Sequence, residues 1–191
     1  MELKEGLPII AFETTGEYAD WIEAHANDAG MWLKVAKKGS GMRTISYAEG
    51  VEVALCYGWI DGQKQTYDER YFLQKFTPRR ARSVWSKINV EKVAALTAAG
   101  KMQPAGLAAV AAAKADGRWE QAYDSGRTMA APEDFVAALE ASPKAKAFWA
   151  TLGKTNTYAI LWRIVTAKKP ETRAARIEKY VTMLAAGEKL Y

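Results

Sequence analysis

The segment 77–89, TPRRARSVWSKIN, carries the residue types best suited to hold an anion. Between residues 70 and 90 the chain has six basic residues and no acidic one. Arginine offers forked hydrogen-bond donors to phosphate or carboxylate, serine hydroxyls add further hydrogen bonds, and an indole offers a stacking face. The segment therefore predicts an anion or nucleic-acid site. The alternative is a solvated loop whose arginines pair with carboxylates elsewhere while Trp85 anchors it to the core.

A second candidate stretch, 57–62 (YGWIDG), places an aromatic ring and a carboxylate where a predicted helix ends. Asp61 could accept a hydrogen bond from an arginine of the first stretch or orient a ligand. The alternative is a structural turn in which Asp61 accepts from local backbone N–H groups. The predicted ligand-binding set from both stretches is Trp59, Asp61, Arg79, Arg80, Arg82, Ser83, Trp85, Ser86, Lys87 and Asn89.

Residue counts exclude several classes of site. One cysteine, Cys56, and one histidine, His25, cannot form an intrachain disulfide or a Cys/His metal cage. No Walker A, GxGxxG or HExxH motif occurs. We therefore predict no metal site and no cofactor. We also predict no catalytic residue, because a Cys56 nucleophile would need a base and His25 is remote in sequence. An enzyme acting on a small anionic substrate, with Asp61 or Glu49 as acid or base, stays open as an alternative.

The charge balance permits an anionic partner without requiring one. The chain has 27 basic and 22 acidic residues, for a net charge of +5, which a lysine-rich solvated face would produce equally well. The segment 1–21 has no apolar run of signal-peptide length, and no stretch approaches the roughly 20 apolar residues of a membrane span. We expect a cytoplasmic protein without membrane insertion. Its expected partner is a small anionic ligand or a protein, with nucleic acid as the alternative.

Strand and helix patterns alternate in the part of the chain that must position these residues. The apolar run 7–12 and the alternating run 31–37 predict strands, and residues 63–67 and 71–76 predict a hairpin. The S-x-x-E sequence at 46–49 has the form of a capping box, in which each side chain satisfies a backbone N–H of the other residue. It predicts a helix that ends before the second candidate stretch.

After Pro78 the pattern is helical to the end of the sequence. Asn89 is the expected N-cap of a helix over 90–99, and prolines at 104, 132, 143 and 170 stand where further helices begin. In the last helix Ala174, Ile177, Val181 and Leu184 are expected to be buried. The basic residues interleaved there with Glu171 and Glu178 predict a mostly solvated face; they are Arg163, Lys168, Lys169, Arg173, Arg176 and Lys179.

These elements predict an α+β fold, with a small antiparallel or mixed sheet packed by helices and a helical C-terminal half. The α+β part spans about residues 7–80 and the helical part about residues 84–187. The joint at 77–89 contains Trp85 and Ile88 and lacks the composition of a linker. We therefore expect a single domain over residues 1–191.

Four ordered motifs resemble the YdeI/OmpD-associated family, also called bacteriocin-protection proteins. They are ISYAEGVEVALCYGWIDGQ at 45–63, FTPRRARSVWSKIN at 76–89, GKMQPAGLAAVAAAKADGRWEQAY at 100–123 and AKKPETRAARIEK at 167–179. The resemblance covers roughly residues 10–187. It implies a link to envelope stress, to resistance against cationic peptides or bacteriocins, and to a porin of the outer membrane. It supplies no catalytic residues that could be transferred to this sequence.

Three classes of function follow from the sequence. The first is a non-enzymatic binding or stress-protection protein whose contact surface includes the predicted ligand-binding set, and we favour it. The second is a nucleic-acid-binding protein that uses the basic 70–89 segment. The third is the enzyme on a small anionic substrate described above. The sequence does not distinguish the ligand, the partner or the oligomeric state.

Overall fold

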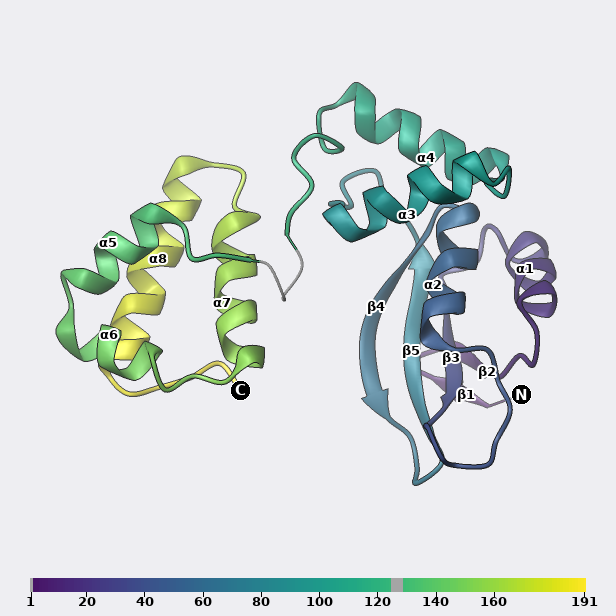
Figure 1. Ribbon diagram of the computed structural model, residues 1–191, viewed down its shortest axis with the longest axis horizontal. Helices are drawn as coiled ribbons and strands as arrows, with labels where there is room; N and C mark the ends of the chain where they lie inside the picture. Colours follow the sequence, from purple (N-terminus) through teal and green to yellow (C-terminus); the bar gives the residue numbers. More distant parts are fainter. Residues whose placement is uncertain (1, 125–128) are drawn as a thin grey trace. The chain divides into compact units, whose positions relative to one another are not determined.

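A computed structural model describes residues 2–124 and 129–191 and divides the chain into two compact units, residues 1–122 and 123–191. The described residues form a five-stranded mixed sheet and eight helices (Figure 1). This confirms the predicted α+β class and the helical character of the C-terminal part. Whether the two units act as one domain stays a prediction.

The sheet lies in the first unit and has the strand order β1-β2-β3-β5-β4. β2 and β3 run parallel and the other neighbouring pairs run antiparallel. β4 begins four residues earlier than predicted, because Trp59 pairs with Pro78 across the hairpin. Trp59 and Asp61 therefore lie within a strand. The strands are β1 Leu3–Lys4, β2 Leu7–Ile10, β3 Met31–Ala36, β4 Trp59–Thr66 and β5 Tyr71–Pro78.

Four helices belong to the first unit: α1 Thr15–Ala24, α2 Tyr47–Cys56, α3 Lys87–Ala98 and α4 Pro104–Ala115. The capping box predicted at the start of α2 is present, since Ser46 Oγ accepts from the Glu49 N–H at 3.2 Å and Glu49 Oε2 accepts from the Ser46 N–H at 2.7 Å. Thr14 and Glu17 make the same pair of bonds at the start of α1. These reciprocal bonds satisfy donors that a helix start leaves open.

The predicted start of α3 is wrong by three residues. Ser86 is the N-cap, and its hydroxyl accepts from the Asn89 N–H at 3.2 Å. Asn89 lies inside the first turn. Serine and asparagine are both good N-caps, so the sequence alone did not decide between the two starts.

The helices α3 and α4 complete the core of the sheet unit. Val93, Leu96, Val110 and Ala113 are buried in the same cluster as the inner face of the sheet. α4 packs closely on the end of α2, where a Cβ added at Gly106 would lie 2.1 Å from the Cys56 carbonyl oxygen. The sequence predicts that an α+β part gives way to a helical part near residue 80. In the structure the secondary structure changes there, but the compact unit continues to residue 122.

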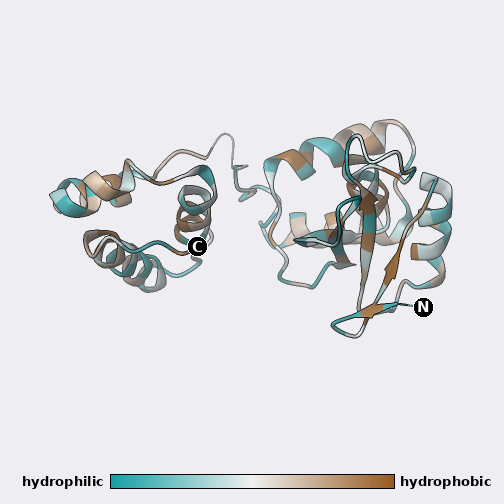
Figure 2. Cartoon of the chain, turned by 90° about the horizontal axis from the view of Figure 1, so that it is seen from below, coloured by the Kyte–Doolittle hydropathy of each residue, from teal (hydrophilic) through white to brown (hydrophobic). Residues whose placement is uncertain are grey.

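The outer face of the sheet explains the alternation of large apolar and cationic residues in β3. Trp32 is fully buried there, and the ammonium groups of Lys4 and Lys75 lie 5.8 and 5.3 Å from its ring centroid. Lys34 lies 4.2 Å from the Tyr67 ring centroid. Aliphatic lysine stems can cover apolar surface while their charges stay in water. Figure 2 shows brown, hydrophobic segments on the strands of the sheet.

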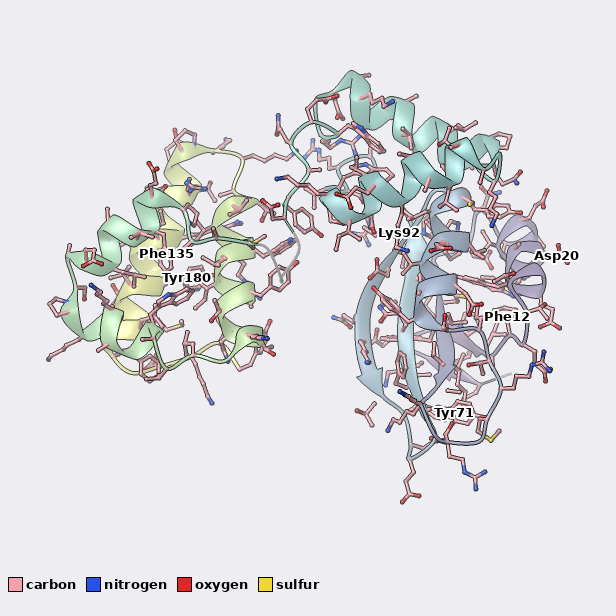
Figure 3. All side chains as sticks on the ribbon, viewed as in Figure 1. Phe12, Asp20, Tyr71, Lys92, Phe135 and Tyr180 are labelled. Atoms are coloured by element: carbon pink, nitrogen blue, oxygen red, sulfur yellow. The ribbon has the colours of Figure 1, made fainter. Side chains whose placement is uncertain are left out.

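The second unit contains α5 Glu133–Glu140, α6 Pro143–Trp149, α7 Lys154–Val165 and α8 Pro170–Ala185. Its core includes Phe135 and Tyr180, which point between the helices (Figure 3). Asp134, in the first turn of α5, accepts from the guanidinium of Arg173 at 2.6 and 2.8 Å. That fork joins α5 to α8 across the sequence.

The predicted buried face of the last helix is right in part. Ile177 and Leu184 are buried and Val181 is half-buried, but Ala174 is exposed and Tyr180 takes the further buried position. A large aromatic side chain fills more of the interior than alanine does. Among the described residues, no helix combines the length and apolar character needed to cross a membrane.

Candidate functional site

The first predicted stretch folds back on itself around Trp85. The guanidinium carbon of Arg79 lies 3.4 Å from the Trp85 ring centroid, and its Nη1 donates to the Val84 carbonyl oxygen at 3.2 Å. Trp85 is only 1% exposed, and the Trp119 ring meets it edge-on at 4.9 Å. A desolvated cation–π contact of this kind stabilises by about 2 kcal/mol. Arg79 and Trp85 therefore hold the loop against the core.

The serines of this stretch also make local bonds. Ser83 Oγ accepts from the Arg80 N–H at 3.0 Å, and the Ser83 carbonyl oxygen accepts from Arg118 Nη1 at 2.8 Å. Ser86 caps α3 through its bond to Asn89. These contacts shape the turn that connects β5 to α3.

Three cations of the same stretch stay at the surface. The residues Arg80, Arg82 and Lys87 are exposed. An anion site on this loop would depend on them, because Trp85 offers no free ring face. That anion site stays a prediction.

The second predicted stretch is adjacent to the first along the backbone. The Arg79 N–H donates to the Gly58 carbonyl oxygen at 3.0 Å. The side chains nevertheless have different surroundings: Trp59 is 2% exposed with its ring 6.1 Å from that of Trp21, and Asp61 Oδ2 accepts from the Tyr47 hydroxyl at 2.7 Å. The structure thus brings the backbones together, while Trp59 serves the core and Asp61 ties β4 to α2.

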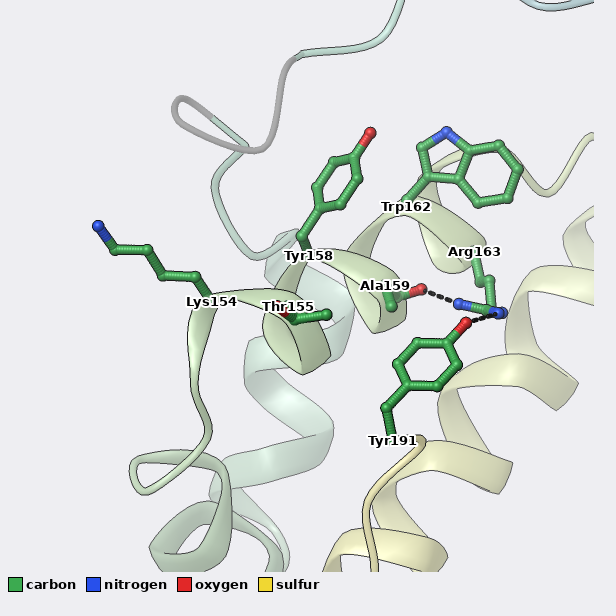
Figure 4. Close-up of a pocket in the computed structure, with 7 residues that line it drawn as sticks. All are labelled: Lys154, Thr155, Tyr158, Ala159, Trp162, Arg163 and Tyr191. Carbon is green, nitrogen blue, oxygen red and sulfur yellow. Dashed lines mark hydrogen bonds between the residues drawn. The ribbon is translucent and has the colours of Figure 1, made fainter. Parts of the chain in front are cut away.

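A groove on α7 in the second unit provides a more open arrangement of aromatic and cationic groups (Figure 4). It has a volume of about 550 Å³. Six residues of α7 that recur at helical spacing line it together with one residue from the C-terminal segment, and no lining residue is acidic. The lining residues are Lys154, Thr155, Tyr158, Ala159, Trp162, Arg163 and Tyr191.

The groove has small residues at its floor and rings at its sides. Tyr158 and Trp162 are one helical turn apart on α7, and Figure 4 shows them projecting from one side while the Tyr191 ring lies across Ala159 on the other. The Tyr123 ring meets the Trp162 ring edge-on at 6.2 Å. Aromatic side chains present broad apolar faces with few rotatable bonds, so such walls suit a flat or apolar ligand body.

Two anchors hold the Tyr191 ring in place. Asn156 pairs with its backbone, donating to the Tyr191 carbonyl oxygen at 3.1 Å and accepting from its N–H at 3.0 Å. Arg163 Nη2 donates to the Tyr191 hydroxyl oxygen at 3.0 Å, and Arg163 Nη1 donates to the Ala159 carbonyl oxygen at 2.8 Å. The guanidinium is therefore fixed at one end of the groove.

The electrostatics of the groove are positive at both ends. Lys154 is the first residue of α7 and Arg163 follows nine residues later, so the two stand about 13 Å apart along the axis at 1.5 Å per residue. Lys154 also lies where the positive end of the helix dipole attracts anions. Together they favour a ligand that carries negative charge and an apolar or aromatic body.

The spacing of the aromatic and basic residues in α7 is a sequence signal for this groove, but the same spacing also fits core packing and a solvated basic face. Lys154, Tyr158 and Trp162 are spaced by four residues and must share a helix face. Tyr158 and Trp162 fit equally well into an apolar stripe, and Arg163 into a solvated basic face. The apolar stripe that the sequence predicts here consists of Tyr158, Leu161, Trp162 and Val165, and of these only Leu161 is buried. The contribution of Tyr191 depends on the tertiary fold, and no sequence pattern signals it.

Two family models match the chain. Residues 10–109, more than half of the sequence, match a domain of unknown function, DUF8412. The chain belongs to the DUF8412 family. Residues 128–187 match the family described as Bacteriocin-protection, YdeI or OmpD-Associated, which confirms the resemblance for that part of the chain. The motifs at 45–63 and 76–89 lie in the range that DUF8412 covers.

The α7 groove thus lies mostly in the part of the chain that matches the second family model. Six of its seven lining residues fall within 128–187, and Tyr191 lies just beyond. No curated protein and no solved structure matches the chain.

Proposed function

We propose that this chain is a non-enzymatic binding protein whose α7 groove holds a small anionic ligand with an aromatic or apolar body. The observation that carries the proposal is the combination of three ring faces with two cations in a groove without acidic residues. A ring stacked on an aromatic side chain contributes about 1–3 kcal/mol. Each charge contact at an exposed site adds about 0.2–1 kcal/mol.

A binding role agrees with the family description of residues 128–187, which names bacteriocin protection. We propose that capture of such a ligand is the molecular event behind a protective role, and that it takes place in the cytoplasm. The predicted loop site would then be a separate surface, since its fixed members Arg79 and Trp85 serve the fold of the first unit.

The test is titration calorimetry with a graded set of probes: benzoate, indole-3-acetate and adenosine monophosphate. We expect the two larger anions to bind more tightly than benzoate. Trp162→Leu should weaken binding at least fivefold, and Lys154→Gln should weaken it by about two- to fivefold. Lys179→Gln, which removes an exposed cation from α8 outside the groove, is the matched control and should leave the dissociation constant unchanged. No binding by any of these anions at millimolar concentration would refute the proposal.

A nucleic-acid interaction is the second candidate, and the exposed cations Arg80, Arg82 and Lys87 favour it. A single-stranded oligonucleotide held by this loop should dissociate steeply as salt is raised. Replacing Arg80 by glutamine should reduce the magnitude of the slope of log affinity against log salt concentration by about one, because one phosphate contact is lost. No retardation of DNA or RNA at low salt would remove this candidate.

A further inference from the structure

A second pocket opens in the first unit, between α1, α2 and the segment that joins α3 to α4. It has a volume of about 270 Å³. That is about nine times the volume of a water molecule in the liquid, which suits a ligand smaller than a drug molecule. Its lining residues are Thr15, Gly16, Ala19, Glu49, Glu52, Val53, Cys56, Tyr57, Leu96, Lys101 and Gln103.

Three residues of this lining carry groups that attract a carboxylate. Thr15 and Gly16 form the first turn of α1, and among the described residues their N–H groups have no acceptor. Such donors, at the positive end of a ten-residue helix, favour an anion. Lys101 adds a full positive charge to the lining, and none of the ion pairs among the described residues includes it. A Cβ at Gly16 would have only the Thr14 hydroxyl within 4 Å, so the pocket is open beside the start of α1.

Groups that attract an ammonium come from α2. Glu49 and Glu52 are one turn apart and both line the pocket. Glu49 uses Oε2 for the capping box, and its bonds to Ser46 lower the pKa of its carboxyl, so the group stays charged at neutral pH. Glu52 Oε1 accepts from the Lys92 ammonium at 2.8 Å. Each carboxylate thus keeps a second oxygen for a ligand.

The remaining lining includes an apolar part and a thiol. Val53, Leu96 and Ala19 contribute aliphatic groups, and Cys56, which is 6% exposed, contributes its sulfur. Burial raises the pKa of the Cys56 thiol, so the sulfur stays protonated and weakly polar. These groups suit a short aliphatic or thioether side chain.

We propose that this pocket binds a zwitterion of the α-amino acid class, with its carboxylate at the start of α1 and Lys101, its ammonium at Glu49 and Glu52, and its side chain over Cys56. A ligand with only a carboxylate would face the two glutamates without compensation. A ligand with only an ammonium would meet Lys101 and the helix start. The lining therefore selects for both charges on one small molecule, and this site is independent of the α7 groove.

The experiment titrates the full chain with the twenty amino acids and with matched fragments of valine. 2-Methylpropylamine lacks the carboxylate of valine, and 3-methylbutanoate lacks its ammonium. We expect at least one aliphatic or sulfur-containing amino acid to bind, and to bind at least tenfold more tightly than the fragment that lacks either charge. An amine that binds as tightly as the amino acid would overturn the zwitterion class, and so would absence of binding by all twenty at 10 mM, roughly the weak end of specific affinity.

Three variants locate the site. Lys101→Gln and Glu49→Gln should each weaken binding at least fivefold, and glutamine still completes a capping box, so α2 keeps its start. Ala19→Leu, which adds three carbon atoms at a half-buried lining position, should abolish binding while circular dichroism shows an unchanged helix content. Lys38→Gln, in the exposed loop after β3, is the control. Binding that all three variants leave intact would place the ligand elsewhere and overturn the proposal.

Discussion

Two glycine-to-alanine substitutions with opposite expected signs test how the first unit packs. At Gly106 an added Cβ would lie 2.1 Å from the Cys56 carbonyl oxygen and 2.9 Å from that of Leu55. Both atoms belong to the backbone of α2, so α4 must move away. At Gly16 the nearest atom to an added Cβ is the Thr14 hydroxyl at 3.9 Å. Both glycines are helical, so the intrinsic gain from alanine is similar at the two positions.

The magnitudes follow from the contacts. Alanine in place of a helical glycine stabilises by about 0.5–1 kcal/mol when the site has room. At Gly106 that gain is opposed by overpacking of about 1–3 kcal/mol. A shift of α4 would also weaken the hydrogen bond from the Gln103 N–H to the Cys56 carbonyl oxygen, which is 3.1 Å long. Loss of that hydrogen bond would cost about 1 kcal/mol of stability. We expect Gly106→Ala to destabilise the protein by about 2 kcal/mol and Gly16→Ala to stabilise it by about 0.5 kcal/mol.

Urea unfolding followed by tryptophan fluorescence measures both values. Five of the seven tryptophans lie in the first unit, and the other two lie in α6 and α7 of the second unit. The fluorescence can therefore contain two transitions, and the relevant one is that of the first unit. An unchanged or raised midpoint for Gly106→Ala, matching the change for Gly16→Ala, would refute the close packing of α4 on the end of α2.

Three further predictions concern caps, ion pairs and the thiol. Ser86→Ala should lower the free energy of unfolding by about 1 kcal/mol because it removes the N-cap of α3, whereas Asn89→Ala should change it by less than about 0.5 kcal/mol; the reverse order in urea unfolding would restore Asn89 as the cap. Asp134→Asn should lower the free energy of unfolding by about 0.5–1 kcal/mol at pH 7. Arg173 lowers the pKa of the Asp134 carboxyl, so the stabilisation from this ion pair is present above the ordinary aspartate pKa and is lost as pH falls through the lowered value. A difference in stability between variant and wild type that persists at pH 2 would contradict this ion-pair contribution. Iodoacetamide should alkylate Cys56 at least tenfold more slowly in the folded protein than in urea, because the side chain is buried and because burial raises the thiol pKa and so lowers the fraction of reactive thiolate. Equal rates at pH 8 would show that the thiol is not buried.

Local rules accounted for much of the fold. The capping box at Ser46 predicted the start of α2, and the alternation in 31–37 predicted the strand β3. Prolines at 104, 143 and 170 stand in the first turns of α4, α6 and α8. These features involve neighbours within a few residues, so the sequence contains the physical cause.

The site depended on contacts that local rules do not contain. Whether Arg79 faces solvent or stacks on Trp85 is decided by where the core closes, and Trp119, more than thirty residues later, completes that arrangement. Likewise Tyr191 becomes a wall of the α7 groove only because Asn156 and Arg163 hold it. The arginines and the indole of 77–89 therefore indicated groups able to interact with a ligand, but not whether those groups serve binding or packing.

Ligand titration against the α7 groove tests the central claim most directly. Adenosine monophosphate and indole-3-acetate are titrated into the wild-type chain and into Lys154→Gln, with amide chemical shifts recorded at each step. We expect saturable shifts concentrated in α7 and at Tyr191, and an affinity about two- to fivefold lower in the variant. The variant should be as stable as the wild type, since removing a cation from a helix start costs nothing through the dipole. Absence of shifts in α7 at millimolar ligand, or equal affinity for both proteins, would contradict the account.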